Sequence, residues 1–144
     1  MLLHDVFIQD EAERTVVHLH FLLWRDKGVP DDMYPLLAFR RKVRSLDAGA
    51  SGPLLIHCSA GVGRTGTFMA IDMLLDEAKR CGEVDILAVV THLRRQRMTL
   101  VQTKVSFTNT LQTPAGMLVL SLHKHLTCRT RDLPVLTAAV IGSN

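Results

Sequence analysis

The chain has 144 residues, of which 47% are hydrophobic and 22% charged, a composition that excludes wholesale disorder and fits one domain. It carries 17 Lys and Arg against 14 Asp and Glu, and this weak excess, without a clustered basic face, gives no indication of nucleic-acid binding. The cysteines are too few for a disulfide framework, no apolar run reaches the length of a membrane span, and the first residues do not resemble a signal peptide. We therefore expect a soluble intracellular chain, or part of one, that does not insert into a membrane.

Two strands are predicted near the start of the chain. Residues 6–8 and 15–21 are rich in β-branched and aromatic side chains, and a charged turn separates them. Residues 24–30 (WRDKGVP) contain glycine and proline, so we expect a loop after the second strand.

The first predicted helix begins near Met33, with Asp31 or Asp32 as its cap and Pro35 in its first turn. Helical spacing gives it an apolar stripe made of Leu36, Leu37, Val43 and either Phe39 or Arg40. The basic residues Arg40, Arg41, Lys42 and Arg44 are expected largely on the side that faces water.

Residues 54–57 form a short and almost wholly apolar run, which predicts a strand buried on both faces of an α/β sheet. A glycine-rich turn then leads into a predicted helix over residues 65–80, which ends at Gly82. A further helix is predicted over residues 84–96, with Ile86, Val89, Val90 and Leu93 facing the core and Arg94 and Arg95 facing water. Residues 117–126 are compatible with another helix, and the last residues show no clear period.

Residues 57–66 (HCSAGVGRTG) carry the chemistry. A predicted strand ends at Cys58, small residues make a tight turn, and Arg64 stands where a helix starts. Successive backbone amides in such a loop can point at an anion, and the positive end of the helix dipole reinforces them. Arg64 adds a planar fork of donors that matches two phosphate oxygens. The pattern predicts a phosphate-binding loop.

The same electrostatic field favours a thiolate at Cys58, because a thiol pKa of about 8.5 falls to roughly 3.5–7.5 at a helix N-terminus beside a cation. Such a thiolate suits in-line attack on a phosphate ester, and Thr65 can donate a hydrogen bond to the sulfur. The reaction also needs a general acid, and Asp26 in the loop of residues 24–30 is the leading candidate. Gln102 is placed to orient the attacking water.

Three motifs resemble those of the tyrosine-specific protein phosphatases. Residues 57–68 resemble the signature loop, residues 24–30 the mobile acid loop, and residues 97–103 (RMTLVQT) the glutamine loop of that family. Dual-specificity phosphatases share the Cys-five-residues-Arg core but generally lack the other two contexts. The resemblance implies an α/β fold, with a twisted mixed sheet flanked by helices.

The resemblance also implies hydrolysis of phosphotyrosine on proteins through a phosphocysteine, without a metal or other cofactor. Cys58 would be the nucleophile, Asp26 the acid and later the base, and Gln102 the residue that orients water, while Thr65 would support the leaving thiolate. The implied substrate-binding residues are Asp26, Cys58, Ser59, Ala60, Gly61, Val62, Gly63, Arg64 and Gln102. The implied partners are phosphotyrosine-containing proteins, and the implied location is the cytoplasm or the intracellular part of a receptor-type parent.

The chain departs from the family in three respects that keep other hypotheses open. Arg25 occupies the position of the usual proline in the acid loop, and a proline would stiffen that loop. Residues 1–104 resemble only the C-terminal half of a catalytic domain, whereas residues 105–144 do not resemble the family. A catalytically impaired phosphotyrosine-binding or regulatory module, and a truncated product that does not fold alone, are therefore the alternatives.

Two further residues are interpreted as structural. His57 is expected to form hydrogen bonds that fix the signature loop, and Arg97 to form a pair near the acid loop. The closely spaced histidines His18 and His20 lack an evident third ligand, so no metal site is predicted there.

Overall fold

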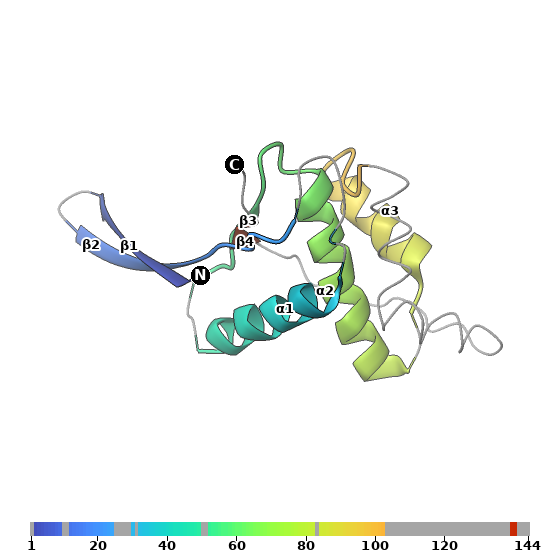
Figure 1. The fold of residues 1–144 in the computed structure, drawn as a ribbon. Helices are drawn as coiled ribbons and strands as arrows, with labels where there is room; N and C mark the ends of the chain where they lie inside the picture. The colour runs from blue at the N-terminus through green and yellow to red at the C-terminus, as the bar shows by residue number, and fades with distance from the viewer. Residues whose placement is uncertain are drawn as a thin grey trace.

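The computed structural model describes residues 2–9, 12–24, 30, 32–49, 52–82, 84–102 and 139–140 (Figure 1). In chain order the elements are β1 (Leu2–Gln9), β2 (Ala12–Leu19), α1 (Tyr34–Asp47), β3 (Ile56–His57), α2 (Gly63–Cys81), α3 (Ile86–Gln96) and β4 (Ala139–Val140). No helix in these ranges is both long and apolar enough to cross a membrane.

The two predicted N-terminal strands are confirmed and form an antiparallel hairpin. Leu2 pairs with Leu19 at one end of the ladder, and Gln9 pairs with Ala12 at the other. The hairpin projects from the body that the helices form (Figure 1). Val16 and Val17 of β2 are exposed, so this part of the hairpin is not covered by the described chain.

The long helix α2 lies between the other two helices and shares a core with each. One apolar cluster joins α2 to α3 and to the residues that follow α3; it contains Ala70, Met73, Leu74, Ile86, Val89, Val90, Leu93, Leu100 and Val101. A second cluster joins α2 to α1 and β3; it contains Phe21, Trp24, Leu36, Val43, Ile56, Phe68 and Ile71. The predicted apolar faces of α1 and α3 are thereby confirmed.

Local chemistry sets the end of α2 and the start of α3. Gly82 ends α2 with φ of +72°, a left-handed conformation that glycine adopts without steric cost. Asp85 begins α3 by accepting a hydrogen bond from the Ala88 amide at 2.8 Å, and an Asp32 carboxylate oxygen accepts from the Tyr34 amide at 2.9 Å. The N-cap of α1 is Met33, which makes no side-chain cap hydrogen bond, so Asp32 lies one residue before the cap position; Asp31, the other predicted cap, lies outside the described residues.

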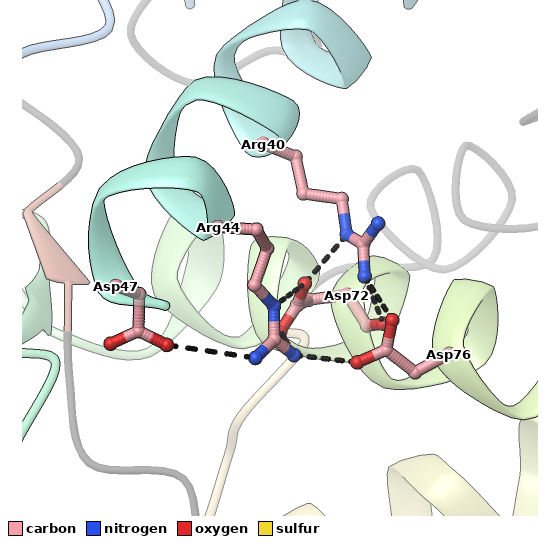
Figure 2. Close-up of polar contacts among 5 residues, drawn as sticks. All are labelled: Arg40, Arg44, Asp47, Asp72 and Asp76. Atoms are coloured by element: carbon pink, nitrogen blue, oxygen red, sulfur yellow. Dashed lines mark hydrogen bonds and ion pairs between the residues drawn. The ribbon is translucent and has the colours of Figure 1, made fainter. Parts of the chain in front are cut away.

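The prediction that Arg40 and Arg44 face water is wrong for Arg40, which is only 5% exposed, and Arg44 is half-buried. Arg40 Nε donates to Asp72 Oδ1 at 2.6 Å, and its Nη2 also reaches Asp76 (Figure 2). Arg44 Nη2 lies 2.5 Å from Asp72 Oδ2 and 2.7 Å from Asp76 Oδ2. Because two carboxylates of α2 neutralise these guanidinium groups, α1 can bury a charged side chain against its neighbour.

The strand before the signature loop is confirmed, but its predicted burial on both faces is wrong. Ile56 is buried, whereas Leu55 is 66% exposed and His57 is exposed as well. β3 pairs in parallel with β4, Ile56 opposite Ala139 and His57 opposite Val140. Leu55 is exposed because nothing in the described residues covers the second face of β3.

The described strands form two separate two-stranded sheets, one antiparallel and one parallel, beside three helices. A single mixed sheet is therefore not present within the described ranges. The helix considered over residues 117–126 lies outside them.

Candidate active site

The signature loop connects β3 to the first turn of α2. Cys58 follows the strand directly, and Gly61 reverses the chain with φ of +68°, which a residue with a side chain rarely adopts. α2 begins at Gly63 without a side-chain cap and without an acidic residue in its first turn. The positive end of this helix is therefore not compensated by a local carboxylate, and it faces the loop that carries Cys58.

The Cys58 sulfur lies inside this turn and is half-buried. The Gly61 amide donates a hydrogen bond to Cys58 Sγ at 3.2 Å. Burial raises the pKa of the thiol, but the Thr65 hydroxyl and the amides of Thr65, Gly61 and Val62 favour the thiolate more strongly, so the net pKa is lowered. Cys58 is therefore ionised at lower pH than an ordinary cysteine.

Thr65 has a hydroxyl suited to this sulfur. Its Oγ1 is buried and, apart from its interaction with the Cys58 sulfur, has no hydrogen-bond partner among the described residues. Of the influences that lower the Cys58 pKa, the Thr65 hydroxyl is the largest. A buried hydroxyl without another partner gains a strong acceptor when the nearby sulfur ionises.

Arg64 and the remaining loop residues lie around the same turn. Arg64 is the second residue of α2 and is half-buried, while Ser59 and Ala60 are exposed. The sequence predicted that these residues share one loop at a helix start, and the structure has that arrangement.

Gln102 is far from the loop in sequence but next to it in space. Its Oε1 lies 3.4 Å from the position that a Cβ would occupy on Gly63. The preceding residue anchors it, because the Val101 amide donates to the Val62 carbonyl oxygen at 3.1 Å. The structure thus places Gln102 beside the start of α2, next to the loop that carries Cys58.

The predicted acid, Asp26, lies outside the described residues, as does its neighbour Arg25. Trp24, which precedes them, is buried in the cluster that joins α1, α2 and β3. The start of the acid loop is therefore fixed to the core near β3.

Two arginines near the loop make contacts that their sequence interpretations did not include. Arg97 contacts the signature loop itself: its Nη2 donates to the Ala60 carbonyl oxygen at 3.4 Å and lies against Gly61. Arg94 is exposed, as predicted, and its guanidinium also donates to the carbonyl oxygens of Leu100 and Val101, at 2.9 Å each. Both arginines bind backbone carbonyls, which carry no sequence signature, so pattern reasoning could not find these contacts.

His57 and the metal-ligating residue types add little to the site. The His57 ring is exposed and makes no side-chain hydrogen bond to another described residue, contrary to its predicted loop-fixing contact. Within the described ranges, no three His, Cys, Asp or Glu side chains are grouped so that they could hold a metal ion.

Comparison with known proteins identifies the family of this chain. A family described as "Protein-tyrosine phosphatase" matches residues 3–113. "Receptor-type tyrosine-protein phosphatase N2" of Macaca nemestrina is 50% identical over 101 residues, which are 69% of this chain and 10% of that protein. "Receptor-type tyrosine-protein phosphatase C" of Rattus norvegicus is 46% identical over 94 residues, 65% of this chain and 7% of that protein. "Receptor-type tyrosine-protein phosphatase-like N" of Homo sapiens is 46% identical over 101 residues, 69% of this chain and 10% of that protein.

The family match implies the cysteine-dependent phosphatase fold for this chain, and the half-buried Cys58 thiol of lowered pKa lies in its loop at the start of a helix. The chain belongs to the protein-tyrosine phosphatase family. It spans about a tenth of the length of the relatives N2 and phosphatase-like N.

Proposed function

We propose that the chain hydrolyses phosphotyrosine on proteins, with Cys58 as the nucleophile. The carrying observation is the Cys58 thiol, whose pKa is lowered by donors of the same loop that would bind the phosphate. Family membership and the position of Gln102 beside Gly63 support the same reaction.

In the first step, Cys58 Sγ attacks phosphorus, the bond from phosphorus to the tyrosine oxygen breaks, and that oxygen takes a proton from Asp26. The amides of residues 59–63 and the Arg64 guanidinium bind the equatorial phosphate oxygens, where negative charge is concentrated. The phenol of the tyrosine side chain leaves, and a phosphocysteine remains.

In the second step, a water oxygen attacks phosphorus, the bond to sulfur breaks, and its electron pair returns to Cys58. The Asp26 carboxylate takes the water proton, and Gln102 orients the water. Thr65 stabilises the departing thiolate with its buried hydroxyl. Inorganic phosphate leaves, and the site returns to its starting state.

The substrates in this proposal are phosphotyrosine-containing proteins. The proposed location is the cytoplasm, where the chain acts alone or as the intracellular part of a receptor-type parent. Residues 1–104 form the partial catalytic domain, whose complete form contains a twisted mixed sheet flanked by helices. Residues 105–144 form a divergent segment in this proposal, although the family match extends over residues 105–113.

The decisive experiment follows phosphate release from a phosphotyrosine peptide and from an aryl phosphate by the full chain. We expect turnover that Cys58→Ser abolishes and that Cys81→Ser, which removes the other described thiol, leaves intact. Arg64→Lys keeps the charge but loses the planar fork, so we expect weaker binding and slower reaction. A folded sample without turnover would refute the proposed hydrolysis.

A second candidate is a phosphotyrosine-binding module with weak catalysis. It is favoured by Arg25, which replaces a stiffening proline beside the acid, and one relative is itself named "phosphatase-like". This candidate predicts phosphopeptide binding by the full chain with negligible hydrolysis. Activity gained in Arg25→Pro would assign the deficit to the acid loop.

A further inference from the structure

The segment that brings Gln102 to the signature loop has an unfavourable backbone conformation. Thr99 has φ of +66° and Val101 has φ of +59°, both left-handed. β-branched residues rarely adopt this conformation, because their side chains crowd the neighbouring carbonyl oxygen. Such a turn persists only where surrounding contacts hold it.

Arg94, in the last turn of α3, supplies two of these contacts. Its Nε donates to the Leu100 carbonyl oxygen at 2.9 Å, and its Nη2 donates to the Val101 carbonyl oxygen at 2.9 Å. The donors belong to one rigid planar group, so they fix two successive peptide units relative to α3.

The same turn is held from its other side by α2. The Val101 amide donates to the Val62 carbonyl oxygen at 3.1 Å, and the backbone of Val101 lies directly against Gly66. Val101 is thus held between the Arg94 guanidinium and the start of α2. Gln102 follows directly, so the placement of its side chain beside Gly63 depends on this residue.

We propose that Arg94 is a positioning residue that acts through Gln102. By holding the Leu100 and Val101 carbonyls, it fixes the Gln102 amide over the phosphate-binding loop and thereby sets the rate of phosphocysteine hydrolysis. Its kinetic consequence rests on the proposed function. Arg94 makes and breaks no bond in that step: water attacks phosphorus, sulfur leaves with the electron pair, and Asp26 takes the proton.

The kinetic test compares Arg94→Met with Arg95→Met, which removes the same charge from the adjacent exposed position. Rapid-quench measurements with an aryl phosphate separate phenol release from phosphate release. In Arg94→Met we expect an unchanged first step and a second step about 10- to 100-fold slower, so that phosphocysteine accumulates. Arg95→Met should match the parent. Arg94→Lys should recover only part of the rate, because a lysine ammonium does not present the planar pair of donors that binds both carbonyl oxygens.

A double variant tests whether the effect passes through Gln102. If it does, adding Arg94→Met to Gln102→Ala slows the second step no further. Additive slowing, or an equal loss in both steps, would overturn the proposal.

Amide hydrogen exchange of the full chain tests whether Arg94 stabilises the turn of residues 99–102, and it does not depend on catalysis. The peptide group between Leu100 and Val101 has two hydrogen bonds, one from Arg94 to its carbonyl oxygen and one from its amide to Val62. Arg94→Met removes the first, so we expect the Val101 amide to exchange faster in Arg94→Met than in Arg95→Met. Unchanged exchange would overturn the proposal. A parent chain without turnover would refute the proposed function, while this exchange measurement would still decide the role of Arg94.

Discussion

Cys58 owes its acidity to donors in its own loop. The Thr65 hydroxyl and the amides of Thr65, Gly61 and Val62 together outweigh the burial that raises its pKa. The thiol is an acid, so a lowered pKa places the reactive thiolate at lower pH than in an ordinary cysteine.

At this scale we predict how alkylation of Cys58 depends on pH. In the parent, the rate with a thiol-selective reagent should reach half its maximum below the usual thiol pKa, which is about 8.5. Thr65→Ala removes the largest lowering influence, so the midpoint should rise, whereas Thr65→Ser keeps the hydroxyl and should stay near the parent. Cys58→Ser gives the background from the other thiols. An ordinary midpoint in the parent would contradict the prediction.

The helix α2 links the site to the rest of the molecule. Its start carries the signature loop, its two sides share cores with α1 and α3, and Asp72 and Asp76 accept the arginines of α1 (Figure 2). Changes in its packing therefore act on both stability and the site.

The buried pair of Arg40 and Asp72 gives a prediction on stability. Asp72→Ala leaves a buried guanidinium without its main partner, so we expect the free energy of unfolding to fall by about 3–5 kcal/mol. Asp76 has a side chain that is 49% exposed, so Asp76→Ala should cost less than about 1 kcal/mol. Urea unfolding of both variants measures the difference. Equal losses of unfolding free energy in the two variants would contradict the prediction that the buried carboxylate contributes more than the exposed one.

Gly66 gives a second prediction for this helix. A Cβ on this residue would overlap the Val101 backbone nitrogen and lie 3.0 Å from the Leu100 carbonyl carbon. Gly66→Ala should therefore push the turn that carries Gln102 away from α2 and destabilise the protein by about 1–3 kcal/mol. Gly52→Ala is the matched control, since its Cβ would meet nothing within 4 Å. Thermal unfolding that is unchanged in Gly66→Ala would refute this packing.

Helix positions were predictable because local periodicity and caps determine them. The apolar positions of α3 and the stop at Gly82 needed no knowledge of distant residues. Arg40 was misplaced because its partners lie on another helix, 32 and 36 positions away. Within the site, the proximity of Cys58 and Thr65 was predictable, because one contiguous segment carries both, the signature loop and the first turn of α2.

Within the part of the chain that the structure describes, the molecule has an open side at β3. Leu55 is exposed, and β3 has one described neighbour, β4, which comes from the end of the chain (Figure 1). Sequence periodicity could not predict β4, because the surrounding residues show no clear pattern. The strand that delivers Cys58 therefore depends on a distant segment.

This dependence predicts the effect of removing the C-terminal strand. Neighbouring amides of a strand point to opposite sides, so only one of the Ile56 and His57 amides can donate to β4. In a chain that ends at residue 138, that one amide should exchange hydrogen about tenfold faster, the equivalent of about one net hydrogen bond, while the other should change little. The amides of Val89 and Val90 serve as the internal control, because the core between α2 and α3 does not include β4. Equal protection of β3 in both chains would contradict the pairing.

The carbonyl oxygen of Val62 accepts from the amides of both Gly66 and Val101, at 3.2 and 3.1 Å. The acceptor is a peptide group, so mutational drift can replace the side chain at position 62 without deleting this acceptor. Replacement of the Val101 peptide nitrogen by an ester oxygen, through chemical synthesis, would remove the hydrogen bond that holds the turn of residues 99–102. The hydrogen bond from the Gly66 amide to Val62 would stay in place.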